Sequence, residues 1–429
     1  MNIYRANIIH TPTPNAFEIW ARGYLCVGDD GCVEGIYEQL PSCYAAAHVT
    51  DFGDQLLIPA FCDMHVHAPQ YRNMGVAMDE ELLQWLNKYT FPEEIRFADI
   101  DHAKRMYSRF VHELWMQGTM RSAVFATSHM AATRILADMF LQSGMGAYIG
   151  LVGMNRNCPS PLVCDTEEHI TGLKALMQYL DSKQMGESHP LCQPIVTPRF
   201  IPSCTPDMLE QLGRIASQYN LPVQSHLSEN MSEIEWVKEL EPDALTYAHA
   251  YHKYGLFGQT PTLMAHCCYT DGAEKELMRE CNVIAVHCPT SNSNLASGIA
   301  PIKQLLQANI PVALGTDVSG GNNLSVLRTI QYAIQLSKLQ YAQSKRTIPF
   351  ISLSEAFYMA TKAGGSFFGN VGAFIKGYEF DALVVNDNYL NHDNYSLLHR
   401  IERYIYLGDD RDIVVRFCRG KEVSKPIRL

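Results

Sequence analysis

Short apolar segments alternate with longer amphipathic segments through the middle of the chain, and this alternation limits the possible fold more than any other sequence feature. The amphipathic segment at residues 207–218, for example, carries Met208, Leu209, Leu212 and Ile215 at helical spacing. Strands alternating with helices are typical of parallel βα units, and eight units predict an α/β fold, a (βα)8 TIM-type barrel. The predicted strands are residues 55–61, 122–126, 147–152, 194–197, 221–224, 262–265, 283–286 and 311–314.

Five of these strands lead directly into a charged or titratable residue: Arg199, His226, His266, His287 and Asp317. In a βα barrel the carboxyl ends of the strands meet at one mouth, where catalytic groups lie. Taken singly, each histidine could be a packing residue and Asp317 could cap a helix. Five such coincidences in one barrel favour a shared site.

His65 and His67 form a His-x-His pair just past the first predicted strand. Residues two apart on an extended chain point the same way, so both imidazoles can face one centre. The pair alone is equally compatible with two solvated loop histidines. Together with His226 and Asp317 at other strand ends, it points to zinc or a similar borderline metal, with one coordination position left for water.

Glu229 lies three residues after His226, within one turn of a predicted metal ligand. Its carboxyl group could exchange protons with a substrate held at the metal. The alternative is that Glu229 caps or solvates the helix that follows, and only the neighbouring histidine favours the catalytic interpretation.

Both ends of the chain have the short apolar runs and turn signals of β-structure. We therefore expect residues 1–57 and 370–429 to build one composite β-sandwich domain, and residues 58–369 to form the catalytic barrel. Two separate β-appendages are the alternative, but neither junction is rich in proline, serine or charge, as a linker would be.

The composition is 47% apolar and 18% charged, with a formal net charge of −11. These values are typical of a globular protein and argue against nucleic acid or an anionic membrane as a partner. The first residues lack the pattern of a secretion signal, and the thirteen cysteines include no Cys-x-x-Cys pair. We expect a cytoplasmic protein with reduced thiols and no membrane span.

Eight motifs distributed over nearly the full length make the chain similar to the amidohydrolase superfamily, and most of all to its members that deaminate guanine. They are PAFCDMHVHAPQY (59–71), WLNKYTFPEE (85–94), TPRF (197–200), QSHLSEN (224–230), MAHCCY (264–269), HCPTSN (287–292), GTDVSGG (315–321) and YLGDDR (406–411). WLNKYTFPEE in particular is not generic to the superfamily. The resemblance implies a barrel with a composite β-sandwich, a zinc ion and a homodimer.

The resemblance also implies roles for single residues. The metal ligands would be His65, His67, His226 and Asp317. His266 would contact the metal-bound water or the metal, and Glu229 and Asp317 would move protons. The substrate-binding residues would be Gln70, Arg199, Phe200 and His226. Superfamily members with two metals use a lysine from the fourth strand, where this chain has Pro198, Arg199 and Phe200, so the resemblance implies one zinc per subunit.

The implied reaction is the hydrolytic deamination of guanine to xanthine and ammonia. An aminohydrolase for 8-oxoguanine, a pterin or an aminotriazine would share the metal and Glu229, so only the pocket residues Gln70, Arg199 and Phe200 favour guanine. A cyclic amide hydrolase would need the missing lysine. A non-catalytic scaffold of the same fold is opposed by the complete ligand set. The C-terminus, PIRL, matches a PDZ ligand too weakly to predict such a partner.

Overall fold

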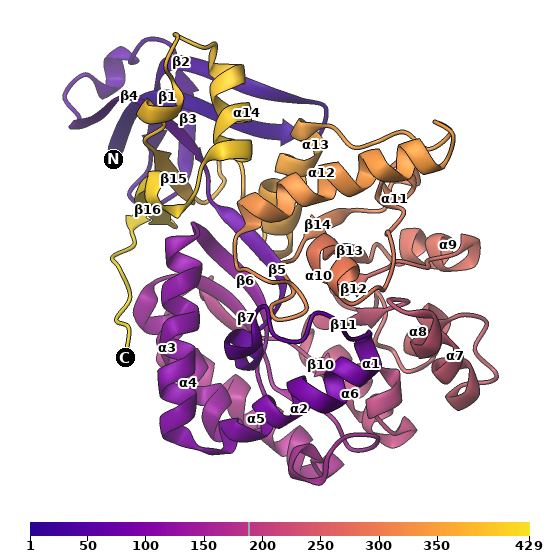
Figure 1. Ribbon diagram of the computed structural model, residues 1–429. Helices are drawn as coiled ribbons and strands as arrows, with labels where there is room; N and C mark the ends of the chain where they lie inside the picture. The colour runs from indigo at the N-terminus through magenta and orange to yellow at the C-terminus, as the bar shows by residue number, and fades with distance from the viewer. Residues whose placement is uncertain (188) are drawn as a thin grey trace.

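The computed structural model describes residues 1–187 and 189–429. Parallel strands in its centre form the predicted barrel, with the carboxyl ends of the strands at one mouth (Figure 1). In the described part of the chain its strands are β5 (Phe61–His67), β6 (Thr119–Phe125), β7 (Gly146–Gly150), β9 (Cys192–Pro194), β11 (Val223–Leu227), β12 (Thr262–His266), β13 (Ile284–His287) and β14 (Val312–Leu314). Short strands β8 (Val152–Gly153) and β10 (Thr197–Pro198) pair beside them.

Backbone contacts close the two four-stranded halves of this sheet into a ring. Val196, after β9, forms a parallel bridge with Val223 of β11. At the other seam, the Asp317 N–H donates to the His65 carbonyl at 2.8 Å, and the His67 N–H donates to the Val318 carbonyl at 3.1 Å. The second seam therefore places Asp317 directly beside the His-x-His pair.

Helices cover the outside of the barrel strands (Figure 1). α6 begins at Pro206 and ends at Tyr219, close to the predicted helix, and buries the predicted apolar face. Two short helices, α1 (Leu82–Trp85) and α2 (Phe91–Ile95), lie on either side of a π-helical turn at residues 86–90. The others are α3 (Ile100–Met116), α4 (Met130–Ser143), α5 (Thr166–Lys183), α7 (Met231–Leu240), α8 (Tyr247–Lys253), α9 (Gly272–Glu280), α10 (Pro289–Asn294), α11 (Ile302–Gln307), α12 (Val326–Gln343) and α13 (Leu353–Tyr358).

The prediction that residues 55–61 form the first barrel strand is wrong. Two strands that belong to different sheets meet within this range. β4 (Val49–Pro59) belongs to a sheet outside the barrel, and the barrel begins with β5. The chain changes sheets at Ala60, whose N–H donates to the Asp381 carbonyl at 3.0 Å. Since both strands are buried here, the apolar run continues across the change without a signal in the sequence.

A bulge in β5 aims the histidine pair into the barrel. Asp63 pairs with Ser122 and Val66 with Val124, so β5 has one residue more than β6 between these pairs. Met64 packs in the apolar barrel interior, whereas Val66 packs in the outer core. Because the bulge shifts the alternation by one residue, His65 and His67 face inward, and the pair lies inside the strand and not past its end.

Strands from both ends of the chain share one seven-stranded sheet of order β17-β16-β15-β4-β1-β2-β3. The sheet is strongly curved, since the rings of Tyr4 in β1 and Phe417 in β16 pack against each other with centroids 5.0 Å apart, although β15 and β4 lie between the two strands. Its halves thus enclose a common core, as in a sandwich. The remaining bounds are β1 (Asn2–Thr13), β2 (Ala16–Val27), β3 (Val33–Tyr37), β15 (Ala382–Val385), β16 (Ile413–Cys418), β17 (Lys421–Glu422) and a helix, α14 (Leu397–Leu407). Domain limits at 57/58 and 369/370 stay a prediction.

A buried ion cluster joins this sheet to the barrel. Arg121 of β6 donates to both oxygens of Asp381, at 2.6 and 3.1 Å, and to Glu379 at 2.6 Å. The guanidinium and the Asp381 carboxylate are almost completely shielded from solvent. The two units are therefore held in register by charges that neither unit satisfies alone.

Arg121→Leu should destabilise the protein by about 3 kcal/mol or more, because it leaves buried carboxylates without a partner. Arg214→Leu, which removes an exposed i,i+4 pair with Glu210, should change the free energy of unfolding by less than about 1 kcal/mol. Urea unfolding of both variants checks the difference. Equal stability of the two would mean that the cluster does not hold the units together.

Candidate metal centre and active site

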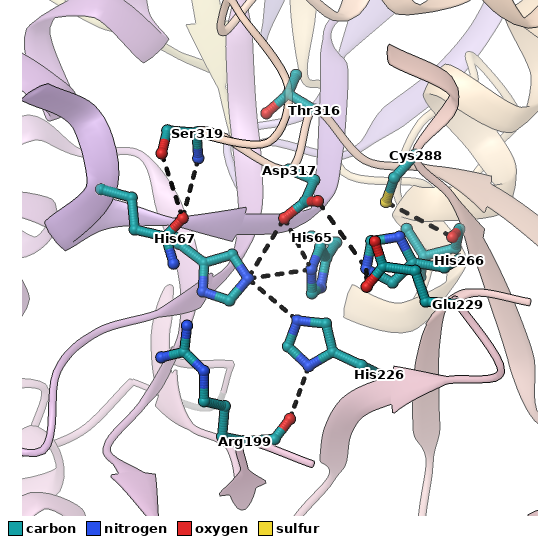
Figure 2. A network of polar contacts seen from close by, with 12 residues as sticks. His65, His67, Arg199, His226, Glu229, His266, Cys288, Thr316, Asp317 and Ser319 are labelled. Atoms are coloured by element: carbon teal, nitrogen blue, oxygen red, sulfur yellow. Dashed lines mark hydrogen bonds and ion pairs between the residues drawn. The ribbon is translucent and has the colours of Figure 1, made fainter. Parts of the chain in front are cut away.

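Ligand atoms from three strand ends converge at the barrel mouth (Figure 2). The His67 Nε2 atom lies 3.2 Å from the Nε2 atoms of both His65 and His226. Asp317 Oδ1 lies 3.2 Å from His65 Nε2 and 3.3 Å from His67 Nε2. The four predicted ligands, from β5, β11 and the loop after β14, therefore surround one point.

The spacing of these atoms fits a metal ion. Zinc binds histidine nitrogen at about 2.0–2.1 Å, which puts two tetrahedral ligands roughly 3.3 Å apart. Nδ1 of His226 donates to the Arg199 carbonyl at 2.6 Å, so the Nε2 lone pair faces the centre. His266 resembles it, because its Nδ1 contacts Asn292 Oδ1 at 2.8 Å while its buried Nε2 has no hydrogen-bond partner in the described residues. The donor set suits a borderline divalent metal.

The electrostatics keep the ligands in the states that bind metals. Burial lowers the pKa of His65, lowers that of His67 to about 4, and lowers that of His226 well below its ordinary value, so these imidazoles are neutral at pH 7. Burial alone would raise the pKa of Asp317, but the charges and hydrogen bonds of the neighbouring histidines hold it well below the ordinary range. Neutral imidazoles and one ionised carboxylate are the forms that coordinate a metal.

Asp63 ties the two sides of the closing seam together. Its Oδ1 accepts the Thr316 N–H at 2.9 Å, and its Oδ2 accepts the Thr316 hydroxyl. Asp317 itself has a φ of 47°, in the left-handed region that is costly for a residue with a Cβ. These hydrogen bonds hold the loop in that conformation. The backbone conformation, together with the side-chain rotamer, therefore directs the Asp317 carboxylate at the histidines.

Glu229 lies beside the metal centre, fully enclosed by protein. Its Oε1 accepts a hydrogen bond from the Ser297 hydroxyl at 2.9 Å, and its Oε2 is 3.4 Å from His266 Nε2. Burial, with the charge of Asp317, raises the pKa of Glu229 to about 8, although the bond from Ser297 lowers it. Burial therefore favours the protonated form of this carboxyl group, which can donate a proton.

The capping role considered for Glu229 belongs to its neighbours. Asn230 is the N-cap of α7, and Glu233 completes the capping box. The Glu233 Oε2 atom accepts the N–H of Glu229 at 3.2 Å, and its Oε1 accepts the Tyr247 hydroxyl at 2.8 Å. Glu229 is thus held by its backbone, and its side chain is free to face the centre.

A cavity opens onto these residues. Gln70, Arg199 and Phe200, which the resemblance implies as substrate-binding residues, line it together with His67, His226 and Asp317. The apolar part of the lining includes three residues of the helical segment at residues 82–86: Leu82, Trp85 and Leu86. The cavity therefore offers planar apolar surfaces, two side chains with N–H donors, and a carboxyl group near the centre.

The model of the amidohydrolase family matches residues 56–423, most of the chain. The chain belongs to the amidohydrolase family. The guanine deaminase of Dictyostelium discoideum is 35% identical over 99% of this chain and 98% of its own, and that of Mus musculus is 33% identical over 98% and 96%. A solved guanine deaminase from C. acetobutylicum with bound guanine in the active site has a TM-score of 0.95 and 45% identity, covering 99% of this chain and 100% of the other.

Sequence reasoning missed several residues around this amidohydrolase centre. Asp63, Asn292, Ser297 and Glu94 hold the predicted site residues, and none was singled out. Asp63 could have been found as the residue two before His65 on the same strand. Asn292 and Glu94 lie inside the quoted motifs, but only the fold brings them to the site.

One of the predicted strand-end residues lies outside the candidate metal-binding groups of the described residues. His287 ends β13 as predicted and is buried, but it is absent from the groups of described residues that could hold a metal. Burial lowers its pKa to about 3, as expected of a neutral packing histidine. The connection at residues 155–190 contains α5 on the outside of the barrel, and residue 188 within it lies outside the described residues.

Proposed function

We propose that this chain hydrolyses guanine to xanthine and ammonia. The observation that carries the proposal is the cavity itself, because its lining combines the Arg199 and Gln70 donors with Glu229 and the metal ligands. The named guanine deaminases, similar over nearly the full length, support the same substrate. Mixing the purified protein with guanine and identifying both products tests the proposal. No xanthine or ammonia would refute it.

We further propose that zinc occupies the centre, one ion per subunit, held by His65, His67, His226 and Asp317. When bound, zinc lowers the pKa of a water molecule and polarises it for attack. Solved relatives at lower identity include zinc complexes, which supports the choice of metal.

The residues of the chain supply binding and proton transfer. The Arg199 guanidinium meets the C6 carbonyl oxygen of guanine, and Phe200 packs against the purine face. Protonated Glu229 donates to the ring nitrogen beside C2 as water adds to C2. Asp317 accepts one proton of the water and passes it to the exocyclic amine, which leaves as ammonia. Glu229 takes up the other proton and is protonated again. One guanine and one water thus give one xanthine and one ammonia.

Adenine should be a poor substrate, because a donor at its C6 would face the donors of Arg199 and leave those donors without an acceptor, at a cost of roughly 1–3 kcal/mol. Arg199→Ala should lower kcat/KM for guanine by about tenfold to several hundredfold. Metal content should stay unchanged, since the contact to His226 comes from the Arg199 backbone. Steady-state kinetics with guanine, adenine and 8-oxoguanine check both expectations.

Arg72→Ala is the matched control for that variant. Arg72 forms a similar ion pair with Glu93 at 2.8 Å but does not line the cavity. We expect its guanine turnover to remain near the wild-type value. If adenine rivals guanine in the wild type, or if Arg199→Ala retains full turnover, another ring such as a pterin or an aminotriazine becomes the better substrate candidate.

We also propose a cytoplasmic homodimer. The exposed surface between α12 and α14 supports an interface, because Phe350 and Leu407 are apolar, 42% and 51% exposed, and line one groove. Light scattering should give twice the chain mass, and a monomer at micromolar concentration would contradict it. Among the helices that the structure describes, none has the length and apolar character needed to cross a membrane.

A further inference from the structure

Glu94, at the end of α2, contacts both donors of the cavity without lining the cavity itself. Its Oε1 accepts a hydrogen bond from Gln70 Nε2 at 2.9 Å. Arg199 Nη1 donates to the two carboxylate oxygens at 2.9 and 2.8 Å. Both side chains of the ion pair are almost fully buried, so this carboxylate balances the cation in a site of low dielectric constant.

The first consequence concerns the amide of Gln70. A carboxylate can only accept hydrogen bonds, so the Gln70 nitrogen must face Glu94. On the other side, the Ser319 N–H can only donate, and it reaches Gln70 Oε1 at 3.2 Å. The two contacts fix one orientation of the amide. The second N–H of the same nitrogen is then the group that Gln70 can offer to a ligand in the cavity.

The second consequence concerns the guanidinium of Arg199. Its contacts with Glu94 use only Nη1, and the Phe91 ring packs against it at 5.0 Å from the ring centroid. Rotation of the planar group is therefore restricted from two sides. Nη2 and Nε remain as donors, and no hydrogen bond within the described residues uses them. Arg199 and Gln70 thus present donors alone, which suits a ligand edge made of acceptors.

We propose that Glu94 is a positioning residue that sets the preference for an oxo group at C6 of the purine. It acts through Arg199 and Gln70, by holding one guanidinium rotamer and one amide orientation. The inference rests on the proposed function, since it assumes that a purine occupies the cavity. Guanine presents O6 and N7 as neighbouring acceptors, which match such a pair of donors.

A purely structural role of Glu94 makes a different prediction. If it only neutralised a buried arginine, its loss would lower stability and affect every ligand equally. A positioning role should affect only ligands with the C6 oxygen. Hypoxanthine and purine distinguish the two, because neither has an amine at C2 to be hydrolysed and they differ in that oxygen. Their inhibition constants against guanine measure binding to the metal-loaded protein without their own turnover.

We expect Glu94→Gln to raise the inhibition constant of hypoxanthine about 10-fold or more and that of purine less than about 3-fold. It should lower kcat/KM for guanine about 10- to 300-fold with unchanged metal content. In an Arg199→Ala background the same substitution should change the hypoxanthine constant less than about 3-fold, because the group through which it acts is gone. If Glu94→Gln fails to fold, Glu94→Asp replaces it, because this variant keeps the charge but has a shorter side chain. It should still raise the inhibition constant of hypoxanthine more than that of purine.

Glu93→Gln is the matched control. Glu93 is the adjacent residue, equally buried, and pairs with Arg72, Arg96 and His102 outside the cavity. It should lower stability but leave the hypoxanthine-to-purine ratio unchanged. An equal effect of Glu94→Gln on both inhibitors, or fully additive losses with Arg199→Ala, would overturn the inference. Absence of xanthine from the wild type would instead refute the proposed function.

Discussion

Removal of the metal should abolish turnover, and one equivalent per chain should restore it. The reason is that the two groups of described residues that could hold a metal have His65 in common, as expected if one ion is bound. The fourth strand is followed by Arg199 and has no lysine to bridge a second ion. Dialysis against a chelator followed by titration with zinc, with metal content measured at each step, checks this result.

Metal binding should also appear as a gain in stability. Four ligands meet only in the folded chain, so a metal at 100 times its dissociation constant should stabilise the native state by about 2.7 kcal/mol. Thermal unfolding with and without zinc measures this independently of activity. Full activity in the metal-free protein would contradict the centre. Recovery only at two equivalents would contradict the single site.

Glu229→Gln should lower kcat for guanine by about 10²- to 10⁴-fold, because it removes the proton donor and little else. The substituted amide has the same shape, so Ser297 can still donate to its oxygen at the position now held by Oε1. The backbone of residue 229 stays in place through Glu233. Single-turnover kinetics with guanine, together with metal analysis, give the expected combination of intact site and lost chemistry.

Binding measurements complete that experiment. Glu229→Gln should retain its metal and bind hypoxanthine within about 3-fold of the wild type, since the C6 oxygen is met by other residues. Near-normal turnover in this variant would show that Glu229 carries no proton in the reaction. Loss of the metal as well would mean that the carboxyl group supports the centre and not the substrate.

The sequence alone was sufficient to predict the barrel and the residues at its mouth. Seven of the eight predicted strands coincide with barrel strands within a few residues. Parallel strands that are buried on both faces appear in the sequence as short apolar runs, and this signal does not depend on the neighbouring segments. His226, His266 and Asp317 were found by their position at strand ends, which topology alone brings together. The ligand types then indicated the metal chemistry.

Other features depended on the tertiary structure. The change of sheet at Ala60 leaves no mark on the sequence, since both strands are buried where they meet. The bulge in β5 depends on pairing with β6, which no local pattern encodes. Glu94 contacts Arg199, which lies more than a hundred residues further along the chain, whereas the adjacent Glu93 contacts His102. Burial and periodicity are properties of single segments, whereas partners of buried charges are decided only when the segments pack.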